Sequence, residues 1–139
     1  MASENKNKYL EFIQNIITRM NTNSFQLKGM SVTITSALLA LTANDFNILY
    51  VSIVYFSLFI FWGLDAYYLS QERGYRELYN EARKLNENEV DFNLKLKSDY
   101  LKGKNSWSYT LTNKTILPLY ALQAIIALVL IMIFRFFSA

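Results

Sequence analysis

Apolar residues occur in long uncharged runs along this chain, and one of these runs sets its organisation. The run Phe46 to Leu64, FNILYVSIVYFSLFIFWGL, contains no charged residue. A helix of about 20 apolar residues, rising about 1.5 Å per residue, crosses the roughly 30 Å hydrocarbon core of a membrane. We therefore predict a membrane-spanning helix over 46–64 that continues as a polar helix from Asp65.

Two further uncharged runs flank this one. Residues 29–44 are short for a span and rich in Ser and Thr, so a buried helix of a soluble protein also fits this length. The short connection to residue 46 favours a transmembrane hairpin of 29–44 with 46–64, in which small residues allow close helix packing. Residues 115–134 form the third run and are predicted to span as well.

Helical spacing of apolar residues continues outside these runs. From Tyr9 to Met20 they recur every three or four positions, which predicts an amphipathic helix over 8–23. This helix packs on the soluble part of the protein or on a neighbouring subunit, or it lies in the membrane interface. Apolar positions over 68–85 form a short heptad seam, which fits self-association or packing against the 8–23 helix.

A period of two follows this seam. Val90, Phe92, Leu94 and Leu96 alternate with polar residues, and a second alternation begins at Trp107. This pattern predicts a small β-hairpin of about 89–97 with 106–112. The expected fold is a single, mainly α-helical membrane domain over 1–139: an amphipathic helix, a transmembrane hairpin, a cytoplasmic helix plus β-hairpin over 65–114, and a third transmembrane helix.

The distribution of charge predicts the orientation. Nine of the 14 Lys and Arg residues lie in 65–114, and the turn between 44 and 47 has none. Cytoplasmic segments are enriched in Lys and Arg, so we expect a multi-pass membrane protein with a cytoplasmic N-terminus. Lys28 and Asp65 would then meet at the inner interface, where they form an ion pair or each face lipid headgroups.

Composition narrows the chemistry further. The chain has no Cys and no His, which excludes disulfides, thiolate and imidazole nucleophiles and nearly all zinc sites. Its acidic residues are scattered over a mixed-charge segment and fit a solvated helix face. We expect no enzyme activity, no catalytic residue, no metal site and no cofactor.

A basic segment with aromatic residues is the candidate binding site. Lysines attract phosphates and aromatic rings stack on bases, so an anionic ligand such as a nucleotide or short oligonucleotide is expected. Lysines and aromatic residues beside a cytoplasmic bilayer face also serve lipid contact. The predicted ligand residues are Lys95, Lys97, Tyr100, Lys102, Lys104 and Trp107.

Two stretches carry a family resemblance. SFQLKGMSVTITSALLAL (24–41) and FWGLDAYYLSQERGYRELYNEAR (61–83) resemble small bacterial membrane proteins. Similar proteins include SLATT-type effectors and the channel effector of Hailong-type anti-phage systems. The resemblance implies a homo-oligomeric channel that depolarises the infected cell, controlled by a nucleotide or oligonucleotide from a partner nucleotidyltransferase.

One chain with so few spans cannot enclose a wide aqueous path, so a channel requires a ring of subunits in the lipid. The expected function is a ligand-gated, homo-oligomeric ion channel acting in anti-phage defence. The alternatives are a non-conducting membrane adaptor that recruits a partner protein through its cytoplasmic part, or a membrane enzyme that uses carboxylates. The candidate pore residues, each of which also suits a helix–helix contact, are Ser31, Thr33, Thr35, Ser36 and Gln123.

Overall fold

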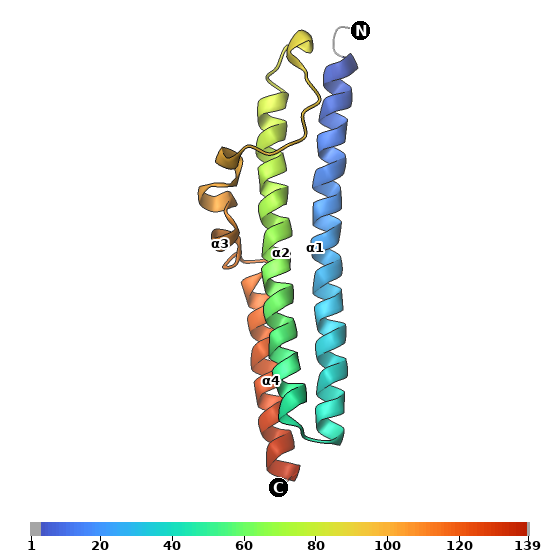
Figure 1. Cartoon of the computed structure of the whole chain (residues 1–139), viewed down its shortest axis with the longest axis vertical. Coiled ribbons are helices and arrows are strands. Elements are labelled where there is room, and N and C mark those ends of the chain that lie inside the picture. The colour runs from blue at the N-terminus through green and yellow to red at the C-terminus, as the bar shows by residue number, and fades with distance from the viewer. Residues whose placement is uncertain (1–3, 139) are drawn as a thin grey trace. The chain divides into compact units, whose positions relative to one another are not determined.

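The structure, a computed structural model, describes residues 4–138 and divides into two compact units. Unit 1 comprises the described residues up to Ser24 together with Ala66–Thr110. Unit 2 comprises Phe25–Asp65 and the described residues from Leu111 onward. The long helices α1 (Glu4–Asn44) and α2 (Ile48–Ala82) each contribute to both units (Figure 1).

The remaining elements belong to one unit each. Unit 1 contains three short 3-10 helices, η1 (Glu87–Glu89), η2 (Ser98–Leu101) and η3 (Gly103–Asn105), and the single-turn helix α3 (Trp107–Thr110). Unit 2 contains α4 (Leu117–Ser138), which lies beside α2 (Figure 1). The predicted 8–23 helix and 29–44 span are thus parts of one helix, α1.

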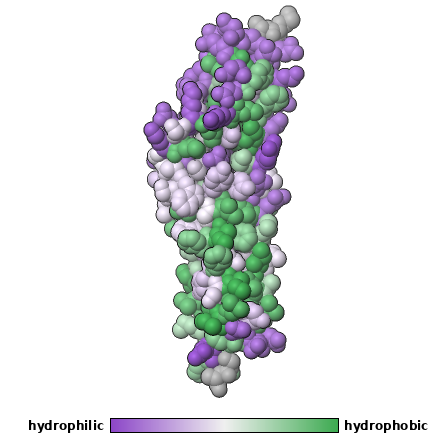
Figure 2. Space-filling model, viewed as in Figure 1, coloured by the Kyte–Doolittle hydropathy of each residue, from purple (hydrophilic) through white to green (hydrophobic). Residues whose placement is uncertain are grey.

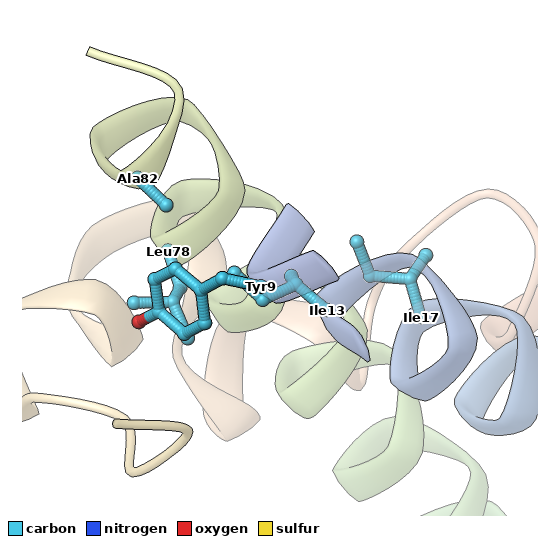
Figure 3. Close-up of a cluster of buried hydrophobic side chains, with 5 residues drawn as sticks. All are labelled: Tyr9, Ile13, Ile17, Leu78 and Ala82. Atoms are coloured by element: carbon cyan, nitrogen blue, oxygen red, sulfur yellow. The ribbon is translucent and has the colours of Figure 1, made fainter. Parts of the chain in front are cut away.

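The core of unit 1 forms between α1 and α2. Tyr9, Ile13 and Ile17 of α1 pack with Leu78 and Ala82 of α2, and each of the five side chains is at most 7% exposed (Figure 3). The apolar face of the predicted amphipathic helix and the heptad seam therefore cover each other. Of the roles that the sequence leaves open for each, packing within the chain is found.

The predicted β-hairpin is wrong, because no strand occurs among residues 4–138. Val90, Leu94 and Leu96 do face one side, but they pack on the helical core cluster instead of forming a paired strand. Phe92 has a φ of 56°, which breaks an extended strand. The alternation of apolar and polar residues therefore arises because one side of this segment packs against two helices.

Turn-forming side chains also explain why this segment forms no β-hairpin. Asp91 accepts a hydrogen bond from the backbone N–H of Asn93, and Asn93 accepts one from Lys95, each at 3.0 Å. Such local hydrogen bonds between side chains and the backbone favour turns over the hydrogen-bond ladder of a β-sheet. The expected second strand is instead α3, where the hydroxyl of the buried Thr110 donates to the carbonyl of Ala66 at 2.9 Å or of Trp107 at 2.8 Å.

The prediction of three membrane-spanning helices is also wrong. Within the described residues, two helices are long and apolar enough to cross a membrane, α2 and α4. Residues 29–44 fall short because frequent Ser and Thr lower the hydropathy of this part of α1. In the most apolar windows of α2 and α4 only 17% and 22% of the residues are buried, unlike the mostly buried core helix of a soluble protein.

Candidate functional site

A charged pair lies in the interior of unit 2. The Nζ of Lys28 on α1 is 2.7 Å from Oδ2 of Asp65 on α2, and the Asp65 side chain is 0% exposed. The hydroxyl of Tyr120 on α4 donates a hydrogen bond of 3.0 Å to the same oxygen. One carboxylate oxygen thus joins all three helices of unit 2.

A second polar contact lies next to this pair. The Nε2 of Gln123 donates to Oγ of Ser31 at 3.0 Å, and that hydroxyl donates to the carbonyl of Lys28 at 2.8 Å. Ser31 is completely buried. Positions three apart share a helix face, so Lys28 with Ser31 on α1 and Tyr120 with Gln123 on α4 present two matching pairs.

Two buried atoms in this region have no hydrogen-bond partner among the described residues. They are Oγ1 of Thr35 and Oε1 of Gln123. Thr35 follows Ser31 by one helical turn and is 5% exposed. We call the six residues Lys28, Ser31, Thr35, Asp65, Tyr120 and Gln123 the polar cluster.

The polar cluster contains three of the five predicted pore residues. Ser31, Thr35 and Gln123 face the interior of the unit, whereas Thr33 and Ser36 are exposed. Thr33 donates its hydroxyl to the carbonyl of Gly29 in its own helix at 2.9 Å. The structure therefore separates the predicted pore residues into an inner and an outer group.

Unit 1 contains a hollow of about 230 Å³. Lys95, Lys97 and Tyr100, three of the six predicted ligand residues, line this hollow. The Nζ of Lys97 lies 5.9 Å from the centre of the Tyr100 ring. Tyr9 and Asn93 also line it, and the Tyr9 hydroxyl donates to the Asn93 carbonyl.

The other predicted ligand residues lie outside the lining of this hollow. Lys102 forms an exposed ion pair of 2.9 Å with Asp99, which holds the pKa of the Asp99 carboxyl below its usual value. The backbone carbonyl of Lys104 accepts a hydrogen bond from Arg73, and Trp107 is 51% exposed on α3. Sequence proximity thus grouped residues that the fold distributes over several surfaces.

The hollow in unit 1 has charges of both signs. Glu81, Glu89 and Asp91 line it together with the two lysines. Oε1 of Glu89 accepts from the Asn86 backbone N–H at 2.7 Å, and Asp91 accepts from Asn93. Burial, and then the nearby Asp91, raise the pKa of the Tyr9 hydroxyl above its usual value.

Sequence reasoning missed Tyr120 and Tyr9. Tyr120 is the only residue with an ionisable side chain in the uncharged run 115–134, and it precedes Gln123 by one helical turn. That combination is a signal for an inward polar face in a span. Helical spacing assigns Tyr9 to the apolar helix face, which is correct for its ring but does not predict the hydrogen bond of its hydroxyl.

No protein-family model matches the chain, and comparisons with curated proteins and with solved structures find no match. Within the described residues, no group of three or more His, Cys, Asp and Glu side chains is placed to hold a metal ion. We therefore infer the function from the two sites described above.

Proposed function

We propose that this protein is an integral membrane protein of the bacterial inner membrane and that its copies assemble into an ion channel. The observation that carries the proposal is the distribution of side chains in unit 2. Large apolar residues face outward, including Phe25 at 75%, Phe56 at 67% and Phe136 at 77% exposure. The polar cluster faces inward, and hydrophobic residues predominate on the visible face of this unit (Figure 2).

This distribution is the opposite of that in a soluble domain. Water favours burial of apolar side chains, whereas hydrocarbon accepts them outside and makes polar groups costly unless they face one another. The buried ion pair of Lys28 with Asp65 meets that requirement. Lipid around α2 and α4 would explain both the outward-facing apolar residues and the inward-facing polar cluster.

Unit 1 belongs on the cytoplasmic side in this proposal. Most Lys and Arg residues lie between the apolar part of α2 and α4, and such segments stay in the cytoplasm. The start of α1 shares a core with this segment, and Glu87 accepts hydrogen bonds from the backbone N–H groups of Asn5 and Lys6. The N-terminal part of α1 is therefore on the same side.

Assembly of several copies is supported by the outer face of α1. Gly29, Thr33, Ala37 and Ala40 recur at helical spacing and are exposed. A Cβ built on Gly29 has no other atom within 4 Å, so a second helix has room to approach there. Small residues at such spacing allow close helix contact in lipid, and we assign this face to contact between copies.

Control by a ligand is the second part of the proposal. Lys95 and Lys97 form no ion pair among the described residues, whereas Glu89 and Asp91 beside them accept backbone hydrogen bonds. These two lysines are the groups we assign to an anionic signal. In an anti-phage effector, that signal would be a nucleotide or short oligonucleotide from a partner nucleotidyltransferase, and flux would depolarise the cell.

Flux measurements test the channel. The purified protein is reconstituted into liposomes with K⁺ and H⁺ gradients, with and without cytosol from phage-infected cells that produce the partner nucleotidyltransferase. The proposal expects ion flux and a mass of several subunits in nanodiscs. A monomer that conducts neither ion under any of these conditions contradicts it.

Charge reversal tests the ligand site separately. Lys95→Glu with Lys97→Glu is expected to abolish the response of flux to infected cytosol while the oligomer mass stays the same. Lys104→Glu is the matched control, because Lys104 is exposed and lies outside the hollow. An unchanged response in the double variant, or an equal loss in the control, contradicts this assignment.

The second candidate function is a non-conducting adaptor. It is favoured by one observation: Trp107 and Tyr109 on α3 are 51% and 46% exposed, as aromatic residues at protein interfaces often are before binding. An adaptor would copurify with a partner protein and conduct no ion. Trp107→Ala would then lower recovery of that partner and leave membrane insertion intact.

A further inference from the structure

The segment 103–110 is attached along one face of α2. Arg73 donates a hydrogen bond of 2.6 Å to the carbonyl of Lys104, and the hydroxyl of the buried Thr110 lies 2.9 Å from the carbonyl of Ala66. Positions 66 and 73 are two helical turns apart and share a face of α2, beside which α3 lies (Figure 1). These two contacts fix the level of the segment along α2.

That level coincides with the end of the uncharged run 46–64. Ala66, which the end of the segment contacts, follows Asp65 directly. The next residue of the chain, Leu111, accepts a hydrogen bond of 2.8 Å from the indole N–H of Trp62, which lies inside the run. In the proposed membrane the apolar part of α2 ends at Asp65, so the segment begins where hydrocarbon gives way to lipid headgroups.

The exposed aromatic side chains at this level suit a headgroup layer. Trp107 and Tyr109 are 51% and 46% exposed, and Tyr67, which follows Ala66 on α2, is 49% exposed. Trp and Tyr are enriched at membrane interfaces, because each joins an apolar ring to one polar N–H or O–H group.

The charge of this part of the chain has one sign. The charged residues between Asp99 and the start of α4 are Lys102, Lys104 and Lys114, and no acidic residue follows Asp99 in the sequence. Lys102 pairs with Asp99, whereas Lys104 forms no ion pair within residues 4–138. Anionic phospholipids of a cytoplasmic leaflet attract lysines of this kind.

We propose that residues 103–110 lie in the headgroup layer of the cytoplasmic leaflet and bind anionic phospholipid there. Lys104 and Arg73 contact the lipid phosphate, and the rings of Trp107 and Tyr109 anchor the segment beside them. The inference rests on the membrane location in the proposed function and does not depend on conduction. Lipid is favoured over a partner protein because the cationic and aromatic side chains gather where the apolar run ends.

The proposal divides the predicted ligand residues between two partners. Lys95, Lys97 and Tyr100 line the hollow of unit 1 and stay assigned to the anionic signal. Lys104 and Trp107 are assigned to lipid. Both roles that the sequence offers for lysines and aromatic residues therefore apply, each to a different set of residues.

Fluorescence quenching tests the level of Trp107. The chain has two Trp residues, so Trp62→Phe leaves Trp107 as the single reporter. In liposomes of phosphatidylcholine and phosphatidylglycerol, a nitroxide on the lipid headgroup is expected to quench Trp107 more strongly than iodide in the buffer does. Where Trp62→Phe does not fold, the difference in quenching between the wild type and Trp107→Phe reports the same residue.

Native mass spectrometry tests the charge. Protein extracted from these liposomes is expected to retain phosphatidylglycerol in preference to phosphatidylcholine. Lys104→Gln is expected to lower this preference about five-fold, the effect of one lysine beside an anionic surface. Lys8→Gln is the control, because Lys8 is exposed and precedes Lys28 by about 30 Å of helix, so the preference should not change.

Each outcome separates this inference from the proposed function. Quenching of Trp107 by iodide but not by the headgroup nitroxide, in a protein that stays in the membrane, would overturn this inference and leave the channel standing. Equal effects of Lys104→Gln and Lys8→Gln on the lipid preference would overturn the role of Lys104. A copurifying protein that shields Trp107 from iodide would assign the segment to the adaptor function instead. Protein that does not enter liposomes would overturn the proposed function and this inference with it.

Discussion

Lys28 and Asp65, far apart in the sequence, meet through a 2.7 Å contact between Nζ and Oδ2, with the carboxylate fully buried. The two residues end the uncharged runs 29–44 and 46–64 at the same side, so an antiparallel pair brings them together. Tyr120 adds a third helix to this contact. One buried carboxylate therefore connects the three helices of unit 2.

Replacing only one partner of this pair is expected to destabilise the protein more than replacing both. Lys28→Met leaves the buried Asp65 charge without its cation, which typically costs about 3–5 kcal/mol. The double variant with Asp65→Leu removes both charges and is expected to recover most of that loss. Thermal unfolding in detergent measures both proteins. Equal losses in the single and the double variant would show that the pair does not set the stability of this region.

Glu87 is expected to stabilise the start of α1. Its two carboxylate oxygens accept from the backbone N–H groups of Asn5 and Lys6 at 2.8 and 3.0 Å. A negative charge at a helix N-terminus contributes about 0.5–1 kcal/mol. Glu87→Gln should lower the melting temperature, and hydrogen exchange at the start of α1 should become faster. Glu77→Gln on the exposed surface of α2 is the control and should change neither measurement.

Gly74 marks a close approach between α2 and the segment after it. A Cβ at this position would lie 2.7 Å from Cδ1 of Leu96 and 2.8 Å from Cδ2 of Leu101. Alanine gains about 1 kcal/mol of helix propensity, but overpacking costs typically about 1–3 kcal/mol, so a net loss of stability is expected. Because Leu96→Ala removes one of the crowded atoms, the two substitutions together should cost less than their separate losses summed. Simple additivity in unfolding experiments would argue against this contact.

Tyr9 is expected to destabilise the folded protein at high pH. Burial holds its pKa above the usual value of about 10, so the unfolded chain releases this proton first. The stability that the neutral hydroxyl contributes is complete below about pH 10 and is lost as the pH rises through the folded-state pKa. Tyr9→Phe should flatten the decline of melting temperature above that pH. Identical declines in both proteins would contradict the assignment.

Helical periodicity predicted more of this fold than did the period of two. The offsets from Tyr9 to Met20 and the seam that contains Leu78 and Ala82 lie on faces that cover each other. In the alternation that follows, Val90, Leu94 and Leu96 are partly buried against this core, whereas Phe92 is 38% exposed. A period of two does not show what that face packs against, and here it is a pair of helices instead of a neighbouring strand. The left-handed φ of Phe92 has no signal in the sequence.

The candidate sites were predictable to different degrees. The contact of Lys28 with Asp65 could be predicted because the two uncharged runs have similar lengths. In an antiparallel pair of helices, these lengths place both residues at the same end, which depends on helix geometry alone. The ligand lysines could not be grouped, because the turns and short 3-10 helices between 95 and 104 direct Lys95 and Lys97 to the hollow but Lys102 to Asp99. Side-chain direction outside regular elements depends on local turns that composition does not encode.

The most direct measurement of the central claim is where the protein resides in the cell. Membranes from cells that produce it are washed at high pH and high salt, and the protein is then extracted with detergent. The account predicts that the chain stays with the washed membrane and leaves it only in detergent, with α4 and the part of α2 that precedes Asp65 protected from added protease. Recovery of a folded, monomeric protein in the wash without detergent would contradict it.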